Sequence, residues 1–519
     1  MKRRGFLLLV VFILFVMMAP AACRRSSSGN AFVIALGDNI RTIDPIGSPS
    51  VDAASERVRT LVFNSLVKKN ANFEYVGELA SDIQRSDDGL TYTFTLHDGV
   101  KFHNDRALSS ADVKYTLDLV FSSNFAKSAS FYEGAGDQKH SYIKSVEAPD
   151  QRTVVVTLIK PWVGLLSNLV PIAIIPSDSY ESQKTHPLGT GPFKFLSYDN
   201  TQQVYDVEAF PEYWDGPSKL QHVRVRVIAD MNALQAELQA GRVDIAPMPT
   251  SLSPDAVKRL EQDPNLQVQA FPGSNVVLLT INTSSPPLDN VKVRQAIAYA
   301  IDRQSLIQNL LLNYGKLAHS IIPEESWAYS TGQTYSYVPA TAKKLLSEAG
   351  VRMDKPIVYK LSGSSLSGRQ YAGVIQNYLK EVGIPVEIQT PEQNTLFDEL
   401  RRGNFQIAYT QWVGGNQDPI FYKDLFATSE IPTQTRPSRN RSRYSNPELD
   451  KLLDEAVNTV DRERGKELYN KIQAIISRDV PILPLWYLSN IVIARKSVGN
   501  IHVDASGDWG FVKNLTVTE

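Results

Sequence analysis

The chain has 519 residues, of which 43% are hydrophobic and 21% are charged, and its formal net charge is −1. Such a balance lacks the basic surface that proteins use to bind nucleic acids, so it argues against that class. The chain is too long for one hydrophobic core, and we expect two or three lobes.

The N-terminus has the organisation of an export signal. Basic residues at 2–4 precede an uncharged apolar stretch from Phe6 to Met18, and small residues follow at 19–22. This order is typical of a secretory signal, so residues 1–22 are predicted to be removed. A retained membrane anchor is the alternative, but the stretch is short for the about 20 residues that cross a bilayer.

Cys23 is the single cysteine of the chain and follows directly on this signal. The sequence PAAC at 20–23 resembles the end of a bacterial lipoprotein signal, with proline where leucine is usual. The resemblance implies that Cys23 becomes the first mature residue and carries acyl chains, with residues 23–30 as a polar tether. Several chains would anchor the protein stably, because each buried methylene contributes ~0.8 kcal/mol. An exported protein with an unmodified thiol is the alternative.

Short strands dominate the sequence from Asn30 to Asp230. The alternating residues 90–103 predict a β-hairpin around the Asp98-Gly99 pair. A helix is predicted to begin after Ser109 or Ser110, either of which would cap it. Further strands are predicted at residues 153–158 and 222–228.

Longer helices follow Pro286. Residues 290–311 place apolar side chains on one face of a single helix, at Val293, Ile297, Ile301 and Leu306. Another helix is predicted to end at Gly383, and a helical hairpin is predicted to begin after Asn446. Strands that alternate with helices indicate an α/β fold.

Eight stretches follow one another along the chain: RTIDP (41–45), LVFNSLV (61–67), DGLTYTFTLHDGVKFHNDRALSSADV (88–113), LGTGPFKF (188–195), YWDGP (213–217), ELQAGRVDIA (237–246), NTSSPPLDNVKVRQAIAYAIDR (282–303) and QWVGGNQDP (411–419). Together they resemble the family 5 extracellular solute-binding proteins, the peptide-, dipeptide- and nickel-binding components of ABC importers. The chain departs from the family pattern at His97, where arginine is usual, and at Asp105-Arg106, near the usual glycine.

Most of these stretches are expected to be scaffold. Gly189, Gly191 and Pro192 suit a tight turn, where glycine adopts backbone angles that other residues avoid. Arg294 and Asp302 are spaced two turns apart on the predicted helix, which favours solvation or structural pairing.

The resemblance implies a two-lobed periplasmic-binding-protein fold of type II, in the peptide-binding cluster, with a hinge and an extra subdomain. The implied division is a signal peptide at 1–22, a lipidated tether at 23–30, lobe I at 31–70, 186–280 and 490–519, an extra subdomain at 71–185, and lobe II at 281–489.

The function implied by the resemblance is that of a substrate-binding lipoprotein on the periplasmic or cell-surface side of the membrane. It would capture a peptide or peptide-like solute in the cleft between the lobes and deliver it to a permease with ATPase subunits. A monomer without cofactor or metal is expected. A metal chelate, an oligosaccharide or an opine is the alternative ligand.

An exported peptidase is the rival class, and an adhesive lipoprotein is a third. The sequence contains no HExxH, GxSxG or P-loop motif. His97 and His103 lie on the two arms of the predicted hairpin, where they could approach each other and hold a metal. A surface or core role is the preferred interpretation of both.

The candidate ligand site is the stretch from Tyr409 to Pro419. Trp412 matches an aromatic residue that lines the cleft in relatives, although core packing is an equal alternative. The resemblance implies these site residues: Tyr409, Trp412, Val413, Gly414, Gly415, Asn416, Asp418 and Arg369.

The resemblance also predicts a difference in ligand preference. Peptide binders commonly carry aspartate three residues after this tryptophan to pair with the ligand's ammonium, and here that position is Gly415. Ser362 stands where a dipeptide-binding relative has an arginine for the far carboxylate, and Arg369 is the candidate substitute. We therefore expect short peptides with a free N-terminus to bind weakly, and a longer or blocked peptide, or another solute, to be preferred. The alternative is that Asp418 or a carboxylate from elsewhere reaches the amine; the Asp418-Pro419 pair is otherwise interpreted as structural.

Overall fold

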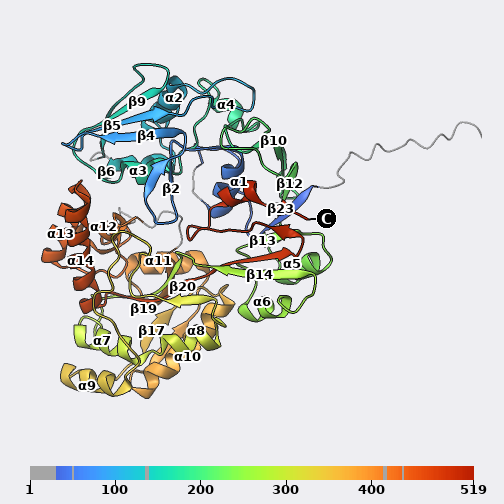
Figure 1. Cartoon of the computed structure of the whole chain (residues 1–519). Coiled ribbons are helices and arrows are strands. Elements are labelled where there is room, and N and C mark those ends of the chain that lie inside the picture. The colour runs from blue at the N-terminus through green and yellow to red at the C-terminus, as the bar shows by residue number, and fades with distance from the viewer. Residues whose placement is uncertain (1–30, 49–51, 135–138, 413–417, 435–437, 519) are drawn as a thin grey trace, which may run out of the picture.

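Two large β-sheets organise the protein, one of seven strands and one of six (Figure 1). The computed structural model describes residues 31–48, 52–134, 139–412, 418–434 and 438–518. Each sheet is covered by helices and forms the centre of one lobe. The two-lobed α/β fold predicted from the sequence is confirmed.

The seven-stranded sheet of the first lobe has the order β10-β11-β12-β1-β13-β21-β14. The central strand β1 is parallel to β12 and β13, whereas β21 is antiparallel to its two neighbours. Strands from both ends of the chain thus share one sheet. Its strands are β1 (Phe32–Leu36), β10 (Phe193–Asp199), β11 (Val204–Ala209), β12 (His222–Val227), β13 (Ile245–Pro247), β14 (Leu266–Phe271) and β21 (Asn490–Arg495).

Helices and short strands complete this lobe. They are α1 (Ala53–Val62), β2 (Val67–Lys69), β3 (Tyr75–Gly77), α5 (Met231–Gln239), α6 (Pro254–Leu260), β22 (Val498–Gly499), the 3-10 helix η4 (Trp509–Asn514) and β23 (Thr516–Val517). Helix α1 packs against η4, so the end of the chain covers its beginning.

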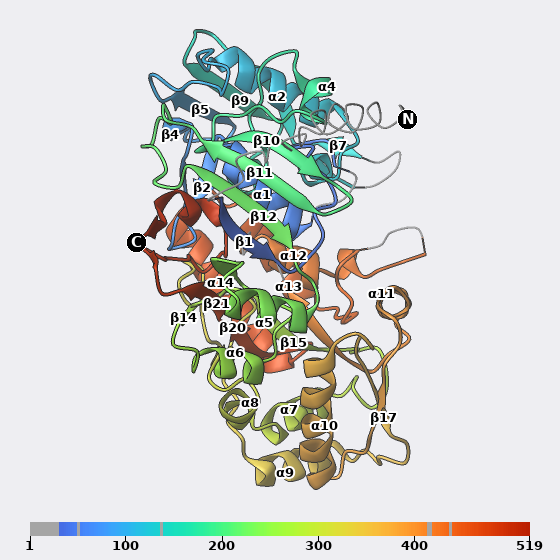
Figure 2. The same cartoon turned by 90° about the vertical axis from the view of Figure 1, so that its right-hand side faces the viewer.

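An extra subdomain with a four-stranded sheet shares its core with the first lobe. The strand order is β4-β5-β9-β8. In Figure 2 this sheet lies at one end of the molecule and helices α7 to α10 at the other, with the seven-stranded sheet between them. Its elements are β4 (Ala80–Arg85), β5 (Thr91–Leu96), α2 (Ser110–Ser122), η1 (Lys127–Phe131), β6 (Tyr132–Glu133), β7 (His140–Ser141), β8 (Ile143–Glu147), β9 (Thr153–Leu158), α3 (Leu165–Leu169) and α4 (Tyr180–Gln183).

The hairpin predicted around Asp98-Gly99 is wrong. Strand β5 pairs with β4 and β9 instead, and the turn that joins β4 to β5 contains Gly89 at φ +69°. Gly99 also has a positive φ, but the chain beyond it folds into a local loop in which Lys101 pairs with Ala107. The alternation of residues along β5 does mark a strand, but its partners are β4 and β9, which the spacing of residues in the sequence does not reveal.

The second lobe is built on the sheet β16-β20-β15-β19-β17-β18. Its strands are β15 (Val276–Ile281), β16 (Gly315–Leu317), β17 (Ile357–Lys360), β18 (Val386–Gln389), β19 (Ile407–Trp412) and β20 (Ile482–Leu488). Its helices are α7 (Val291–Ala300), α8 (Arg303–Asn309), α9 (Pro339–Ala349), α10 (Leu366–Glu381), α11 (Gln393–Arg402), α12 (Phe421–Phe426), η3 (Thr428–Glu430), α13 (Pro447–Asn458) and α14 (Arg462–Asp479).

The single long helix predicted at residues 290–311 is two helices. Asp302 interrupts it, because its side chain accepts the backbone N–H of Ser305 (2.9 Å) and so caps α8. Arg294 is buried and donates to the carbonyl oxygens of Leu288, Asp289 and Asp479. Both residues are therefore structural, although they do not pair with each other.

Gly189 and Gly191 are needed for a different reason from the one predicted. Neither has a positive φ. A Cβ on Gly189 would lie 2.2 Å from the carbonyl oxygen of Val62, and one on Gly191 would lie 2.5 Å from the carbonyl carbon of Val62. The two glycines therefore let this turn lie directly against the end of α1.

Two short crossings join the lobes, at residues 272–275 between β14 and β15 and at residue 489 between β20 and β21. Gly273 brings them together, because a Cβ there would lie 2.0 Å from the carbonyl oxygen of Leu488. Asn490 donates to the carbonyl oxygens of Pro272 (3.2 Å) and Asp504 (2.9 Å) and so ties both crossings to the C-terminal segment. None of the helices in the described ranges combines the length and the apolar character of a membrane-spanning segment.

Candidate functional site

The two lobes meet at Asp418, which precedes α12 in the second lobe and is 8% exposed. Its Oδ2 accepts a hydrogen bond from the hydroxyl of Tyr75, on β3 of the first lobe (2.5 Å). Its Oδ1 accepts the backbone N–H of Ile420 (2.8 Å). Both carboxylate oxygens therefore have partners, and one of these partners comes from the opposite lobe.

Lys69, at the end of β2, supplies a positive charge near this carboxylate. Burial lowers the pKa of Lys69 to about 8, although the negative charges of Asp418 and Asp508 act in the opposite direction and raise it. Burial raises the pKa of Asp418. Its hydrogen bonds to Tyr75 and Ile420 and the positive charge of Lys69 partly offset this by lowering the pKa. Two opposite charges that lose water together are tolerated here because each partly compensates the other.

Further contacts between the lobes flank Asp418. Arg462 forms an ion pair with Glu74 (2.6 Å), next to Tyr75 on the chain. Arg85, on β4 of the extra subdomain, donates to the carbonyl oxygen of Val460 in the second lobe (2.9 Å). On the other side, Tyr314 hydrogen-bonds Glu261, which directly follows α6, so the structure holds the lobes in contact at two separate places.

The first lobe presents the carboxyl ends of its parallel strands near this contact. β1 ends before Gly37-Asp38, and β13 ends before Met248. In open α/β sheets, ligands bind at this edge. Arg57 of α1 lies here, with its Nη2 3.8 Å from Sδ of Met248. Burial lowers the pKa of Arg57, although the negative charges of Asp38 and Asp508 act to raise it. No motif in the sequence singles Arg57 out, and the sequence analysis missed it.

The predicted residues Tyr409 and Trp412 lie on β19, opposite Leu279 and Val276 of β15. Tyr409 is half-buried, its ring centroid lies 6.3 Å from that of Tyr371 on α10, and burial raises its pKa. Val413, Gly414, Gly415 and Asn416 lie outside the described residues.

Arg369 lies in the first turns of α10 and is exposed. Its guanidinium donates to the carbonyl oxygen of Gly363. Ser362 is buried and shares a hydrogen bond with Ser364 (2.8 Å). Both residues are thus engaged locally, at the turn that leads into α10.

His97 and His103 are packing residues. The His97 ring stacks on Trp214 with centroids 4.9 Å apart, and His103 packs edge-on against Phe210 at 5.2 Å. Burial lowers the pKa of His103 to about 4. Over the ranges that the structure describes, no group of three or more histidine, cysteine or acidic side chains is arranged to hold a metal ion.

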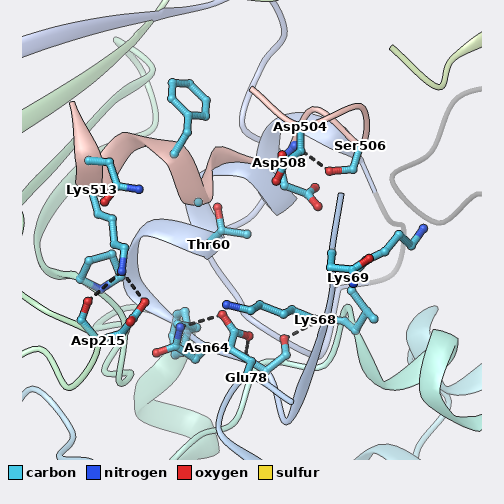
Figure 3. Close-up of a pocket in the computed structure, with 18 of the residues that line it drawn as sticks. Thr60, Asn64, Lys68, Lys69, Glu78, Asp215, Asp504, Ser506, Asp508 and Lys513 are labelled. Carbon is cyan, nitrogen blue, oxygen red and sulfur yellow. Dashed lines mark hydrogen bonds and ion pairs between the residues drawn. The ribbon is translucent and has the colours of Figure 1, made fainter. Parts of the chain in front are cut away.

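A cavity of about 600 Å³ lies within the first lobe, between α1, β2 and the C-terminal segment (Figure 3). Of the described residues in the predicted motif at 409–419, none lines this cavity. Much of its charge is paired internally, because Lys513 contacts Asp215 and Asn64 donates to Glu78 (2.8 Å). We assign the candidate site to the lobe contact instead, where residues of both lobes converge, and note that Lys69 and Asp508 belong to the cavity wall as well.

Two lobes joined by a double crossing, with charged side chains where they meet, define the class of two-lobed binding proteins. The model of the bacterial extracellular solute-binding proteins, family 5, matches residues 74–433, and the chain belongs to this family. The resemblance seen in the sequence is confirmed, and the protein is a solute-binding component of an ABC importer.

Three relatives cover most of the chain. It is 30% identical to heme-binding protein A of Haemophilus influenzae (89% of this chain, 88% of the relative) and 29% identical to the dipeptide-binding protein of Escherichia coli (88% and 89%). The crystal structure of the ABC transporter substrate-binding protein CtaP from Listeria monocytogenes superposes with a TM-score of 0.84 at 26% identity, covering 95% of this chain and 100% of that one.

Proposed function

We propose that the protein captures a peptide or peptide-like solute between its lobes and delivers it to a membrane permease with ATPase subunits. The observation that carries this proposal is the contact of Asp418 with Tyr75, directly after the motif at 411–419, because it ties the motif of the second lobe to the first lobe. A relative of similar length is a dipeptide-binding protein, which supports a peptide.

The proposed mechanism is closure without chemistry. A solute that contacts both lobes favours the closed arrangement by its differential affinity for that state. The protein acts as a monomer, breaks no bond and uses no cofactor or metal. Heme is the ligand named for one relative, so a non-peptide solute is the second candidate.

The domain division given above is part of the proposal. The seven-stranded sheet takes strands from 32–36, 193–271 and 490–495, and the six-stranded sheet takes strands from 276–488, which supports it. The residue boundaries remain a prediction, and the pairing of β3 (Tyr75–Gly77) with β2 favours moving the first of them from residue 70 to a position after residue 77.

The ligand preference follows from Gly415 and from the partners of Asp418. Gly415 removes the acid that would meet a ligand's ammonium. Asp418 is poorly suited to replace it, because both of its oxygens already accept hydrogen bonds and Lys69 supplies a nearby positive charge. Short peptides with a free N-terminus therefore bind weakly, and blocked or longer peptides are preferred.

Calorimetry with Ala-Ala-Ala and its N-acetylated form tests this preference. The wild type should bind the acetylated peptide more tightly. Gly415→Asp should improve binding of the free peptide by ~100-fold or more, because a missing partner of a buried charge costs about 3–5 kcal/mol. Gly414→Asp, one residue away, is the matched control and should show no such gain.

Two outcomes would contradict this preference. Micromolar binding of the free peptide that persists in Asp418→Asn would show that another carboxylate holds the amine. Binding that is lost in that variant would assign the amine to Asp418. Native mass spectrometry of the purified protein would identify any solute that it carries.

A further inference from the structure

Arg57 is short of hydrogen-bond acceptors for its environment. A guanidinium carries five N–H donors, and within the described residues the only hydrogen bond of the Arg57 side chain is that of Nη2 to the thioether of Met248, at 3.8 Å. A thioether is a weak acceptor. The nearby acids Asp38 and Asp508 are exposed and form no ion pair with Arg57.

Other arginines of the protein show what a structural role requires. Arg59, two residues further along α1, forms an ion pair with Glu56 (2.7 Å). The buried Arg303 donates to three carbonyl oxygens at 2.7–2.8 Å. Removing a cation partly from water without such acceptors costs free energy. The presence of Arg57 at this position therefore points to an acceptor that arrives with a ligand.

The position of Arg57 fits that interpretation. It lies where β1 and β13 end, at the ligand-binding edge of the sheet. Asp508 is close enough to influence Arg57 and also lines the cavity of the first lobe. Met248 is held against Gly507, where a Cβ would lie 2.7 Å from its Sδ, and the weak thioether contact is easily exchanged for a stronger acceptor.

We propose that Arg57 binds the carboxylate of the transported solute through the paired N–H donors of its guanidinium, beside Met248. This inference rests on the proposed function and narrows it. The planar fork of arginine matches a carboxylate in two parallel hydrogen bonds. The solute therefore carries a free carboxylate.

Calorimetry with acetyl-Ala-Ala-Ala as the free acid and as the C-terminal amide tests the carboxylate. The wild type should prefer the acid by about 10- to 100-fold, as expected for loss of a charge-assisted pair. In Arg57→Met this preference should disappear, and Arg57→Lys should retain part of it. Equal binding of acid and amide by the wild type would overturn the inference while leaving peptide binding intact.

Thermal unfolding without added peptide provides a second, independent test. Arg57→Met should keep or raise the Tm, because it replaces a poorly satisfied cation by an apolar side chain of similar length. Arg59→Met, the matched control on the same helix, should lower the Tm by about 1–3 °C. If Arg57→Met loses as much as the control, Arg57 is structural and the inference fails. If no peptide binds, the proposed function fails, and this comparison still decides the role of Arg57.

Discussion

His103 is a neutral histidine that bridges two backbone groups. Its Nε2 lies 3.0 Å from the carbonyl oxygen of Gly191, and its Nδ1 accepts the N–H of Gly189 (3.3 Å). Both bonds can form together only in the tautomer protonated at Nε2. Protonation of Nδ1 would break the second bond, which agrees with the lowering of the His103 pKa to about 4 by burial.

This pKa predicts a pH dependence of stability. Between pH 4 and 6.5 the unfolded chain binds a proton at His103 that the folded protein does not, so His103 destabilises the folded state as the pH falls through this window. The loss approaches about 3 kcal/mol near pH 4. His103→Gln should flatten the pH dependence of urea unfolding between pH 4 and 7, and the exposed His186→Gln should not. An unchanged slope in His103→Gln would contradict the assignment.

Single residues were predictable where the cause is local. Gly99 has the positive φ expected of an Asp-Gly turn, and Ser109 is the N-cap of α2, one of the two residues expected there. Arg57 escaped prediction because its significance lies in missing partners, which only the folded arrangement reveals.

Among the elements, the two crossings between the lobes depend on close backbone approach. Gly273→Ala would place a Cβ 2.0 Å from the carbonyl oxygen of Leu488, and backbone cannot move aside cheaply. We expect a loss of about 1–3 kcal/mol in unfolding free energy and weaker solute binding. Gly373→Ala on α10 is the control, because that Cβ meets nothing within 4 Å and should stabilise the helix by about 0.5–1 kcal/mol. Wild-type stability of Gly273→Ala would show that the crossings can separate.

Elements were predicted well wherever caps and periodicity agree. Asn446 caps α13 as expected, and β9 and β12 lie where alternation placed them. The break between α7 and α8 was missed because the apolar spacing continues across Asp302, whose cap decides the boundary. Strand partners cannot be predicted from spacing, and this explains the wrong hairpin at Asp98-Gly99.

For the whole molecule, the attachment to the membrane is the testable question. We propose that Cys23 carries the lipid, and mass spectrometry of the membrane fraction should detect an acylated N-terminal cysteine. Cys23→Ala should release the protein into the soluble fraction, because several acyl chains are required for stable anchoring. Ser26→Ala, within the same segment, should leave the protein in the membrane. An unmodified Cys23 in membrane-purified protein would refute the proposal.

The overall fold and the family could be inferred because the motifs occur in order along most of the chain. The ligand site could be predicted only as a segment. The partner of Asp418 from the opposite lobe is Tyr75, which is separated from it by 343 positions in the sequence, and no periodic pattern connects residues so far apart.

The position of β21 has a consequence for biosynthesis. This strand fills the place between β13 and β14, although it is among the last parts of the chain to be made. The first sheet is therefore left with a gap until translation has passed Arg495, whereas every strand of the second sheet has been synthesised by Leu488. Pairing of such distant segments is slow, and the open edges of β13 and β14 are sites where an unfinished chain can aggregate. The lobe that begins first is completed last.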